Sequence, residues 1–338
     1  MRRKPFRSRV TSHEVALRAG VSQSTVSRVF SGGEGLSQAT RQRVLDAARD
    51  LKYKPNAIAR SLSTRRTQII GLVSSHMTNP YFPLVLQAFT QRLHELGWKV
   101  LLISAGLNED VDELLPEVLA YQVDGLVIVT GLHGRRITEE AQRQGLPAVL
   151  FGRYAMGSGV SAVSCANYEA GREVADAFLE ASHRRLAYIG GLEDTSANVD
   201  RRKGFVERLA ERGVGGCQEE LGVFTYHGGY EAATRLLRSA SPPDAIFCAN
   251  DMPAFGVLDA ARDLGVRVPD DLSVIGFDDI PMAQWSPYNL TTVRQPVEEM
   301  IEVTLELLLE RIDNAKAGSV VRFLPGILVR RGSARLIH

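Results

Sequence analysis

Seven short apolar runs, separated by stretches with helical periodicity, are the feature of this chain that most restricts its fold. Each run has four or five residues, which is the length of a buried strand. One of the stretches between them carries Val85, Phe89 and Leu93 at helical spacing. Strands that alternate with helices predict parallel sheets with helices on both faces, so we expect an α/β body over residues 67–338. The seven runs are residues 69–73, 100–103, 126–129, 148–151, 186–189, 245–248 and 274–277.

The size of this body predicts two lobes. Its 272 residues lie in the range where a single hydrophobic core stops growing and chains divide. Ligands of open α/β sheets bind outside the carboxyl ends of the strands. The residues that follow each apolar run are therefore the candidates for a binding site.

Residues 11–51 predict a small all-helical unit ahead of the body. Residues 11–20 and 21–28 have the pattern of two helices joined by a tight turn at Gly20, and a third helix, residues 38–51, follows the capping residue Ser37. Two helices in this relation form a helix-turn-helix, whose second helix lies in the DNA major groove. The apolar residues that recur through the unit are Val15, Ala16, Ala19, Val21, Val26, Val29, Phe30, Leu36, Val44, Leu45, Ala48 and Leu51.

The distribution of charge supports a nucleic-acid partner for this unit. Residues 1–66 hold 15 Lys and Arg against 4 Asp and Glu, whereas residues 67–338 hold 25 against 35. The formal net charge of +1 therefore combines a basic head with an acidic body. A solvated basic tail is the alternative for residues 2–9, but the periodicity of residues 11–51 favours a folded head. Arg41 and Arg43 in the third helix either touch the DNA backbone or are only solvated.

Side chains at the start of the second helix suit contact with DNA. Ser22 follows the turn and can cap the helix by accepting a backbone N–H bond. Gln23 and Ser24 come next, at the end of a recognition helix that reaches base edges. Arg28 lies one turn further on, where Arg can make a bidentate contact with guanine. Short hydroxyl side chains suit phosphates, which fix register without reading sequence, and here they are Ser22, Thr25 and Ser27.

Two motifs carry a specific resemblance to a known family. Residues 21–29 contain Val-Ser-x-x-Thr-Val-Ser-Arg-Val, and residues 54–62 contain Lys-Pro-Asn-Ala-Ile-Ala-Arg-Ser-Leu. Together they resemble the lactose-repressor (LacI/GalR) family of bacterial transcription factors, over nearly the full length of the chain. The Ser-Gly-Gly of residues 31–33 departs from the Asn that usually ends the family's recognition helix. The resemblance implies a DNA-binding head over residues 1–54, a hinge helix and linker over 55–66, and an effector-binding and dimerisation body over 67–338.

The segment after the head has a mechanism of its own. Ile58 and Leu62 share a helical face with Ala59 beside them, and an isolated helix of this length is marginal in water. In the family, two such hinge helices pack together in the minor groove of a palindrome, and a Leu wedges into a base step. Leu62 is the matching residue, Ala59 would let the two helices approach closely, and Asn56 is a further candidate for DNA contact. A plain linker helix is the alternative.

The same resemblance implies a body like that of a periplasmic sugar-binding protein. Two lobes would enclose a cleft, and the chain would cross between them three times. We expect these crossings near residues 163–165, 290–293 and 323–326. The first lobe would then hold residues 67–163 and 293–323, and the second lobe residues 165–290 and 326–338.

The effector of such a protein binds in the cleft, and eight residues are candidates to contact it. Carboxylates, amides and Arg beside aromatic rings suit a small polyhydroxylated ligand, because hydroxyls take hydrogen bonds and the apolar face of a sugar stacks on a ring. Arg201 matches the family in Arg-x-x-Gly-Phe, and Asp278 matches it in Gly-Phe-Asp-Asp. The eight candidates are Tyr81, Phe82, Arg153, Arg201, Phe224, Asn250, Asp278 and Gln295.

Several neighbouring residues have structural alternatives or depart from the family. Phe82 could belong to the core, Asp251 could only cap a helix, and Asp279 could only cap a turn. Ala166 and His76 stand where the family often has Asp. At Ala166 this indicates either that the Asn after it is unimportant or that the effector differs from the usual sugars.

The remaining composition argues for no cofactor, no metal site and no membrane segment. Three Cys form no Cys-x-x-Cys pair, and the seven His show no metal-ligand spacing. No apolar run approaches 18 residues, and the basic start of the chain is not followed by the apolar region of a secretory signal. We therefore expect a cytoplasmic protein.

The function that these features predict is a sequence-specific transcriptional regulator. We expect a repressor that binds a palindromic operator as a homodimer, because one helix-turn-helix reads only half a palindrome. We expect a small polar metabolite to release it, with a sugar or sugar derivative as the favoured kind. No leucine heptad follows the last expected strand, so a tetramer is not expected. Control by a co-repressor or by a protein partner remains open. An enzyme is disfavoured because the chain lacks the phosphate-binding and nucleophile motifs.

Overall fold

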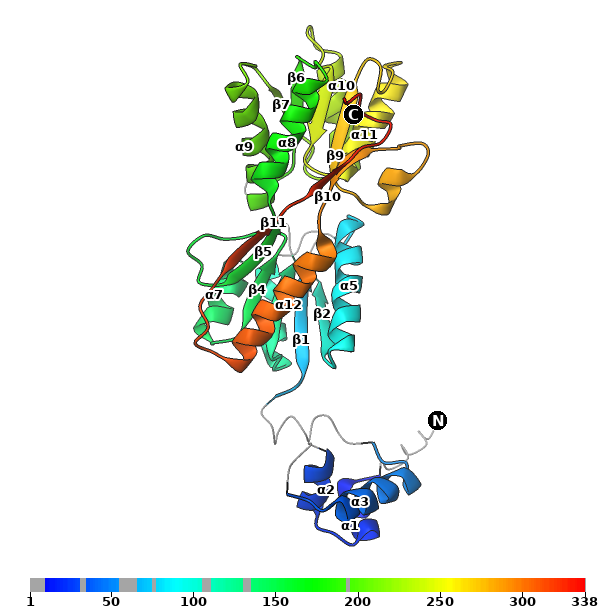
Figure 1. Ribbon diagram of the computed structural model, residues 1–338, viewed down its shortest axis with the longest axis vertical. Helices are drawn as coiled ribbons and strands as arrows, with labels where there is room; N and C mark the ends of the chain where they lie inside the picture. Colours follow the sequence, from blue (N-terminus) through cyan, green and yellow to red (C-terminus); the bar gives the residue numbers. More distant parts are fainter. Residues whose placement is uncertain are drawn as a thin grey trace, which may run out of the picture. The chain divides into compact units, whose positions relative to one another are not determined.

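The computed structural model describes residues 10–30, 35–54, 66–74, 77–104, 111–129, 135–192 and 195–337 (Figure 1). The chain divides into two compact units, Met1–Gln68 and Ile69–His338. This division lies two residues beyond the boundary expected after residue 66. Residues 55–65, which hold most of the expected hinge, lie outside the described residues.

The described part of the head forms three helices, and specific residues set their ends. The helices are α1 (Ser12–Ala19), α2 (Gln23–Phe30) and α3 (Gln38–Asp50). Thr11 and Glu14 form a capping box at the start of α1, and Gly20 ends that helix in the left-handed conformation with φ at 62°. Ser22 Oγ accepts the backbone N–H of Thr25 at 3.2 Å, as predicted. The helix-turn-helix expected from the sequence is therefore present.

The head has its own small core between the three helices. Val15, Val26 and Val44 are fully buried there. Leu45, which belongs to the apolar pattern of the head, is 37% exposed. Val44 points inward, and the next residue of a helix lies about 100° further round.

The first sheet of the body belongs to the lobe in which the body begins. Its strands follow the order β11-β5-β4-β3-β1-β2, and all neighbours pair in parallel. The first strand of the body, β1, lies in the interior of this sheet. Strands β2 and β11 form its two edges. The strands are β1 (Ile69–Ser74), β2 (Lys99–Ser104), β3 (Gly125–Val129), β4 (Ala148–Phe151), β5 (Ser161–Cys165) and β11 (Val321–Leu324).

The second sheet belongs to the other lobe and repeats this arrangement. Its order is β12-β10-β9-β8-β6-β7, and β12 alone among these pairs antiparallel to its neighbour. All seven predicted strands occur in the two sheets. Strand β7 has the sequence Gln-Glu-Glu-Leu and lies at an edge, so it shows no apolar run. The strands are β6 (Leu186–Gly190), β7 (Gln218–Leu221), β8 (Ala245–Cys248), β9 (Ser273–Asp278), β10 (Thr291–Arg294) and β12 (Ile327–Val329).

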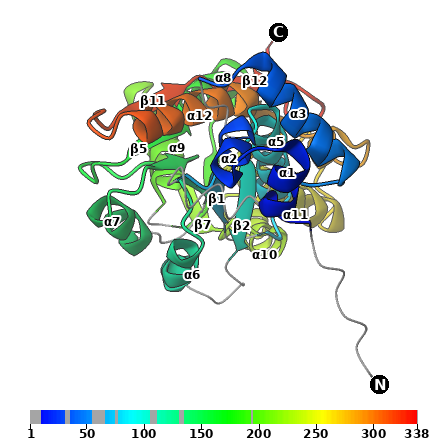
Figure 2. The same cartoon turned by 90° about the horizontal axis from the view of Figure 1, so that it is seen from below.

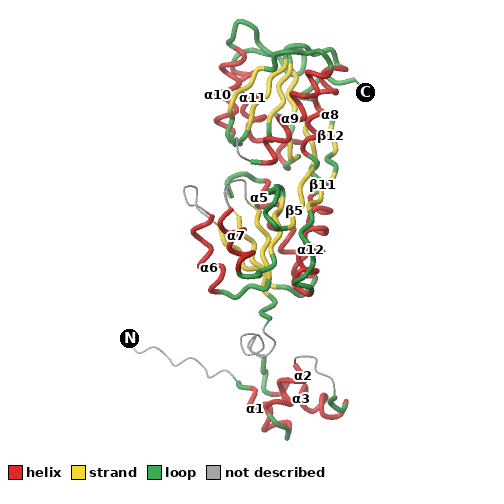
Figure 3. The backbone as a smooth tube through the Cα atoms, turned by 90° about the vertical axis from the view of Figure 1, so that its left-hand side faces the viewer, coloured by secondary structure: helices red, strands yellow, loops and turns green. Residues whose placement is uncertain are grey.

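Helices cover both faces of each sheet. In the first lobe, α12 lies across one face and α6 and α7 lie on the other (Figure 2). In the second lobe, α8 and α9 pack together on one face, and α10 and α11 pack together on the opposite face (Figure 3). The helices are α5 (Tyr81–Glu95), α6 (Leu115–Ala120), α7 (Arg135–Arg143), α8 (Asn167–Glu180), α9 (Ser196–Glu211), α10 (Tyr226–Leu237), α11 (Asp251–Asp263) and α12 (Val297–Asp313), with short 3-10 turns at Val111–Leu114 and Pro281–Gln284.

The chain crosses between the lobes three times. The first crossing follows β5, which continues to Cys165, and the third lies between Leu324 and Ile327. The second was expected at residues 290–293, but β10 occupies residues 291–294 within the second sheet and α12 begins at Val297 in the first lobe. The second crossing therefore lies between Arg294 and Val297.

None of the helices in the described part of the chain combines the length and apolar character needed to cross a membrane.

Candidate functional site

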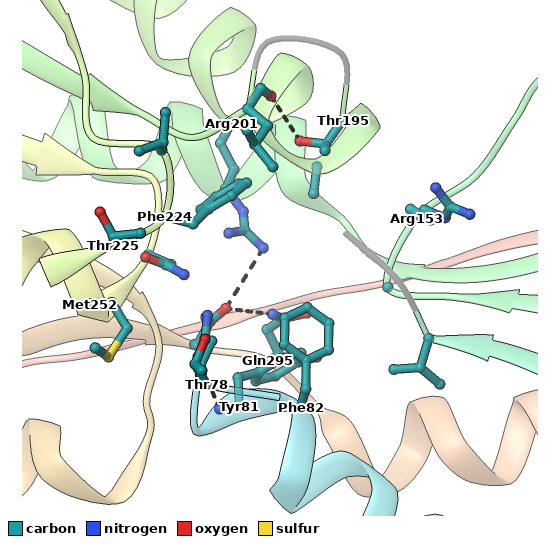
Figure 4. A pocket seen from close by; sticks show the side chains of 18 of the residues that line it. Thr78, Tyr81, Phe82, Arg153, Thr195, Arg201, Phe224, Thr225, Met252 and Gln295 are labelled. Atoms are coloured by element: carbon teal, nitrogen blue, oxygen red, sulfur yellow. Dashed lines mark hydrogen bonds and ion pairs between the residues drawn. The ribbon is translucent and has the colours of Figure 1, made fainter. Parts of the chain in front are cut away.

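A cavity of about 400 Å³ lies between the lobes, where loops from the carboxyl ends of both sheets meet (Figure 4). All eight effector candidates line it. Tyr81 and Phe82 reach it from the start of α5, while Arg201 and Phe224 reach it from the second lobe. The other lining residues are Thr78, Asn79, Val129, Phe151, Gly152, Leu192, Thr195, Ala197, Val223, Thr225, Tyr226, His227 and Met252.

Arg201, on α9, is held in position by several contacts within the second lobe. Its Nε donates to Asn167 Oδ1 at 2.8 Å, and its Nη1 donates to the Ala249 carbonyl oxygen at 2.6 Å. The guanidinium lies over the ring of Phe277, 3.5 Å from the ring centre. Only 4% of Arg201 is exposed, so these contacts fix a buried cation that faces the cavity.

Asp278 provides the carboxylate opposite Arg201. Its Oδ1 accepts from Gln295 Nε2 at 2.7 Å and lies 3.9 Å from Arg201 Nη2. Burial raises the pKa of the Asp278 carboxyl to about 6, and the guanidinium of Arg201 limits the rise. The backbone φ of Asp278 is 113°, a conformation that side chains disfavour and that often marks functional loops.

Tyr81 Oη and Asn250 Oδ1 are buried oxygen atoms of cavity-lining residues, and neither has a hydrogen-bond partner among the residues that the structure describes. The two residues are 8% and 3% exposed. Asn250 stands at the N-cap of α11 but makes no capping bond. Buried polar atoms normally find a partner, so a ligand in the cavity would supply one for each. Burial also raises the pKa of Tyr81 well above its usual value, so its hydroxyl stays protonated.

Two carboxylates named beside the candidates have structural partners instead. Asp251 is fully buried, and its oxygens accept from the Ile280 backbone N–H and the Thr292 hydroxyl. Asp279 accepts from Arg294 Nε and Arg331 Nη2, both at 2.6 Å. Neither lines the cavity. Asp251 joins the start of α11 to β10 and to the segment after β9, whereas Asp279 joins the end of β9 to β10 and to the C-terminal segment.

Sequence reasoning missed the part played by Asn167. Its amide orients Arg201 and also donates to Ser164 Oγ at 3.1 Å, so the residue after Ala166 is important as a positioning residue. The position at the start of α8, right after a strand end, was the available signal. Phe82, for which a core position was the alternative, lines the cavity and is only partly buried.

The head presents most of the predicted DNA-contacting side chains on one helix. Ser22, Gln23, Ser24, Ser27 and Arg28 are exposed, and Thr25 is partly buried. Near the turn, Ser22 Oγ lies 2.7 Å from the hydroxyl of Ser24 and 2.8 Å from that of Thr25. Asn56, Ala59 and Leu62 lie outside the described residues, as does His76.

A metal centre has no support from the part of the chain that the structure describes. No group of three or more His, Cys, Asp or Glu side chains there is placed to hold a metal ion.

Comparison with known proteins gives the family. Residues 11–56 match the family "Bacterial regulatory proteins, lacI family", and residues 175–334 match the periplasmic binding protein-like domain. The HTH-type transcriptional repressor CytR of Escherichia coli (strain K12) is 30% identical over 340 aligned residues, which cover all of both chains. The chain belongs to the lacI family of bacterial regulatory proteins. It is therefore a DNA-binding transcriptional regulator.

Two solved structures of lacI-family regulators share the architecture. The complex of the transcriptional regulator CelR with cellobiose is 33% identical, with a TM-score of 0.73, and covers 96% of this chain and 100% of that one. The lac repressor dimer bound to operator and the anti-inducer ONPF is 25% identical, with a TM-score of 0.87, and covers 96% and 99%. These lacI-family structures agree with the helix-turn-helix head and the two-lobed body described above.

Proposed function

We propose that this lacI-family regulator is a repressor that binds a palindromic operator as a dimer and releases it when a sugar or sugar derivative enters the cavity. The observation that carries the effector half of this proposal is the convergence of all eight candidate residues on one cavity between the lobes. The regulator CelR, which is similar over nearly the whole chain, has been solved with cellobiose.

The chemistry of the cavity supports a small polyhydroxylated ligand. Asn250 Oδ1 can accept a hydrogen bond from a ligand hydroxyl, Asp278 can accept more, and Tyr81 Oη can donate one. Phe82 and Phe224 offer aromatic faces from opposite lobes, which suits the apolar face of a sugar ring. A volume of about 400 Å³ suits one or two sugar rings.

The DNA-binding half rests on the exposed face of α2. Arg28, Gln23 and Ser24 lie where a recognition helix reaches bases, and Ser22, Thr25 and Ser27 supply hydroxyls for phosphates. Asn56, Ala59 and Leu62 remain our candidates for the minor groove. Because the operator is part of the chromosomal DNA, we place the protein in the cytoplasm of a bacterium.

Dimerisation follows from the symmetry of a palindrome, since each head reads one half-site. The lac repressor, which has the same architecture, was solved as a dimer on its operator. Leu84 on α5 and Leu102 on the edge strand β2 are 40% and 48% exposed on the body, and such apolar side chains suit a subunit contact.

The experiment that tests this function starts with the full-length protein and random DNA. Selection of bound sequences should enrich a palindrome with a fixed centre. A panel of mono- and disaccharides, including cellobiose, would then be screened by thermal shift, and each stabilising sugar would be tested for release of the selected DNA. The matched control is Asn250→Ala, which should bind the same DNA and need a sugar concentration at least about tenfold higher for its release.

The outcomes separate the alternatives. A sugar that tightens DNA binding would make the protein co-repressor-dependent. Specific binding to the palindrome that no metabolite alters would favour control by a protein partner. If no sequence is enriched with or without the sugars, the proposed operator binding is wrong.

A further inference from the structure

A hydrogen-bonded contact joins the two lobes beside the cavity. Tyr154 lies in the loop after β4 in the first lobe, and its hydroxyl donates to Asp200 on α9 of the second lobe, at 2.9 Å to Oδ2 and 3.1 Å to Oδ1. The backbone N–H of Tyr154 also donates to Ser196 Oγ, in the first turn of the same helix, at 3.1 Å. One residue of the first lobe thus makes two separate hydrogen bonds to the second.

Each side of this contact is fixed on its own lobe. The ring of Tyr154 packs edge-on against Phe323 of β11, with ring centres 5.2 Å apart. On the other side, the Thr195 side chain caps α9 by accepting the backbone N–H of Asn198. Helix α9 packs so closely on α8 that a Cβ on Gly204 would lie 2.0 Å from the Tyr168 carbonyl oxygen. Neither partner can follow the other lobe when the angle between the lobes changes. Such a change would therefore break the hydrogen bonds of Tyr154.

The contact adjoins the cavity on both sides. Arg153, directly before Tyr154, lines the cavity, and so do Thr195, Ala197 and Arg201 around the second-lobe partners. The contact therefore joins the two lobes next to residues from both lobes that line the cavity.

The environment makes the bond from the Tyr154 hydroxyl stronger than an exposed one. Tyr154 and Asp200 are both partly buried, and hydrogen bonds gain strength where water is excluded. Burial and the neighbouring carboxylate raise the pKa of Tyr154 to about 12, so its hydroxyl is a donor throughout the neutral range.

We propose that Tyr154, Ser196 and Asp200 form an interlobe latch that holds the two lobes in the arrangement that creates the cavity. Lobes that open at the latch separate the cavity walls, so the latch sets the fraction of molecules that is ready for a ligand. This consequence for a ligand rests on the proposed function, whereas the latch itself is tested without any ligand. The three residues act by positioning the lobes and not by contact with an effector.

The test measures the distance between the lobes in full-length, ligand-free protein by pulsed electron paramagnetic resonance. Spin labels are attached at Arg143→Cys on α7 and Glu180→Cys on α8, both exposed, in a Cys217→Ser background. An excess of unlabelled protein keeps two labelled copies from pairing. In Tyr154→Phe the population at the latched distance, relative to the population at the open distance, should fall about tenfold. This is the effect of losing one hydrogen bond to a charged group.

The matched control is Tyr168→Phe. The Tyr168 hydroxyl on α8 donates to Glu207 on α9, the helix that also carries Asp200, at 2.7 Å, and this hydrogen bond lies within one lobe. Its distance distribution should equal that of the parent protein. Ser196→Ala, which leaves the Tyr154 ring in place, should shift the ratio in the same direction as Tyr154→Phe. Equal distributions in the parent, Tyr154→Phe and Ser196→Ala would overturn the latch and leave the operator and sugar experiments unaffected.

Discussion

Arg201 and Asn250 show two different ways in which a single residue prepares the cavity. Arg201 is satisfied by the protein, through Asn167, the Ala249 carbonyl and the ring of Phe277. Asn250 is as buried, but its Oδ1 has no hydrogen-bond partner in the described part of the chain. Removal of a partnered buried group destabilises the fold, whereas removal of an unpartnered one costs little. Asn250 is therefore the sharper probe of ligand binding.

Replacement of Asn250 by Ala should leave stability nearly unchanged and weaken the effector. We expect a change in the free energy of unfolding below about 1 kcal/mol, since no protein hydrogen bond to Oδ1 is lost, and a loss of at least about tenfold in sugar affinity. Urea denaturation and isothermal titration calorimetry measure the two. Arg201→Ala should instead lower both stability and affinity; a stable Asn250→Ala that binds sugar normally would remove Asn250 from the site.

The raised pKa of Asp278 predicts a pH dependence for the effector. The carboxyl has a pKa of about 6 in the ligand-free cavity, so it is ionised above this pH and neutral below it. Sugar hydroxyls donate more strongly to the ionised form. Affinity should therefore be constant above pH 7 and fall, by at most about tenfold per pH unit, as the pH drops below 6.

Titration calorimetry between pH 5 and 8, with the sugar identified by thermal shift, measures this dependence. Asp278→Asn should bind weakly at every pH with a flat profile. Affinity that rises toward low pH would show that the effector donates no hydrogen bond to the carboxylate.

On the head, Arg28→Ala should cost about 1–3 kcal/mol of operator affinity and relax the preference at one base position in each half-site. The residue is exposed on α2, where Arg can read guanine. Repeating the DNA selection with the variant measures both effects. Arg49→Ala removes a positive charge from α3 and not from α2, so it should weaken the binding of all DNA sequences alike. An unchanged base preference in Arg28→Ala would contradict the role assigned to Arg28.

At the scale of elements, the packing of α8 on α9 positions much of the site. Helix α9 carries Arg201 and Asp200, and α8 carries Asn167. Gly171 and Gly204 let the two helices approach so closely that a Cβ on either would collide with the backbone of the other helix. Such a contact cannot relax by a side-chain rotation, so the spacing of the helices depends on these two residues.

Gly204→Ala should therefore force α8 and α9 apart. We expect the body to lose about 1–3 kcal/mol of stability and the sugar response to weaken, because Arg201 moves with its helix. Urea denaturation and sugar-dependent DNA release measure these effects. Gly215→Ala is the control, since a Cβ there meets nothing within 4 Å. Equal stability of the two variants would mean that the helices adjust freely.

At the scale of the whole molecule, function couples a basic head to an acidic body. The counts of charged residues in the two parts give net charges of +11 and −10, which directs DNA to the head and away from the body. An operator with two half-sites needs two heads at a set spacing, so the body must also join two copies. Exposed apolar residues on α5 and β2 are suited to that role.

Sedimentation at micromolar concentration should therefore show a dimer. Leu102→Lys on the edge strand β2 should shift the equilibrium toward monomer and weaken operator binding, because a buried Lys would oppose pairing. Met156→Lys, in an exposed loop of the same lobe, should change neither. A tetramer in the parent protein, or an unaltered dimer in Leu102→Lys, would contradict the proposed assembly or its surface.

The sequence by itself determined the two parts of the chain, seven of the strands and eight of the residues that line the cavity. Apolar runs locate strands because burial on both faces of a parallel sheet demands them, and the residues after those strands converge because parallel strands end at one edge. The capping residues Ser22 and Ser37 could also be predicted, because a cap depends only on residues a few positions away.

Only the tertiary structure decided which polar groups are satisfied and which are left for a ligand. Asp251 and Asp279 look like site residues until their partners on Thr292 and Arg331 are known. Asn167 looks dispensable until its bond to Arg201, 34 residues away, is seen. The contact of Tyr154 with Asp200 joins different lobes and has no sequence pattern. Hydrogen bonds between distant segments depend on how the sheets are placed, and local periodicity carries no information about that.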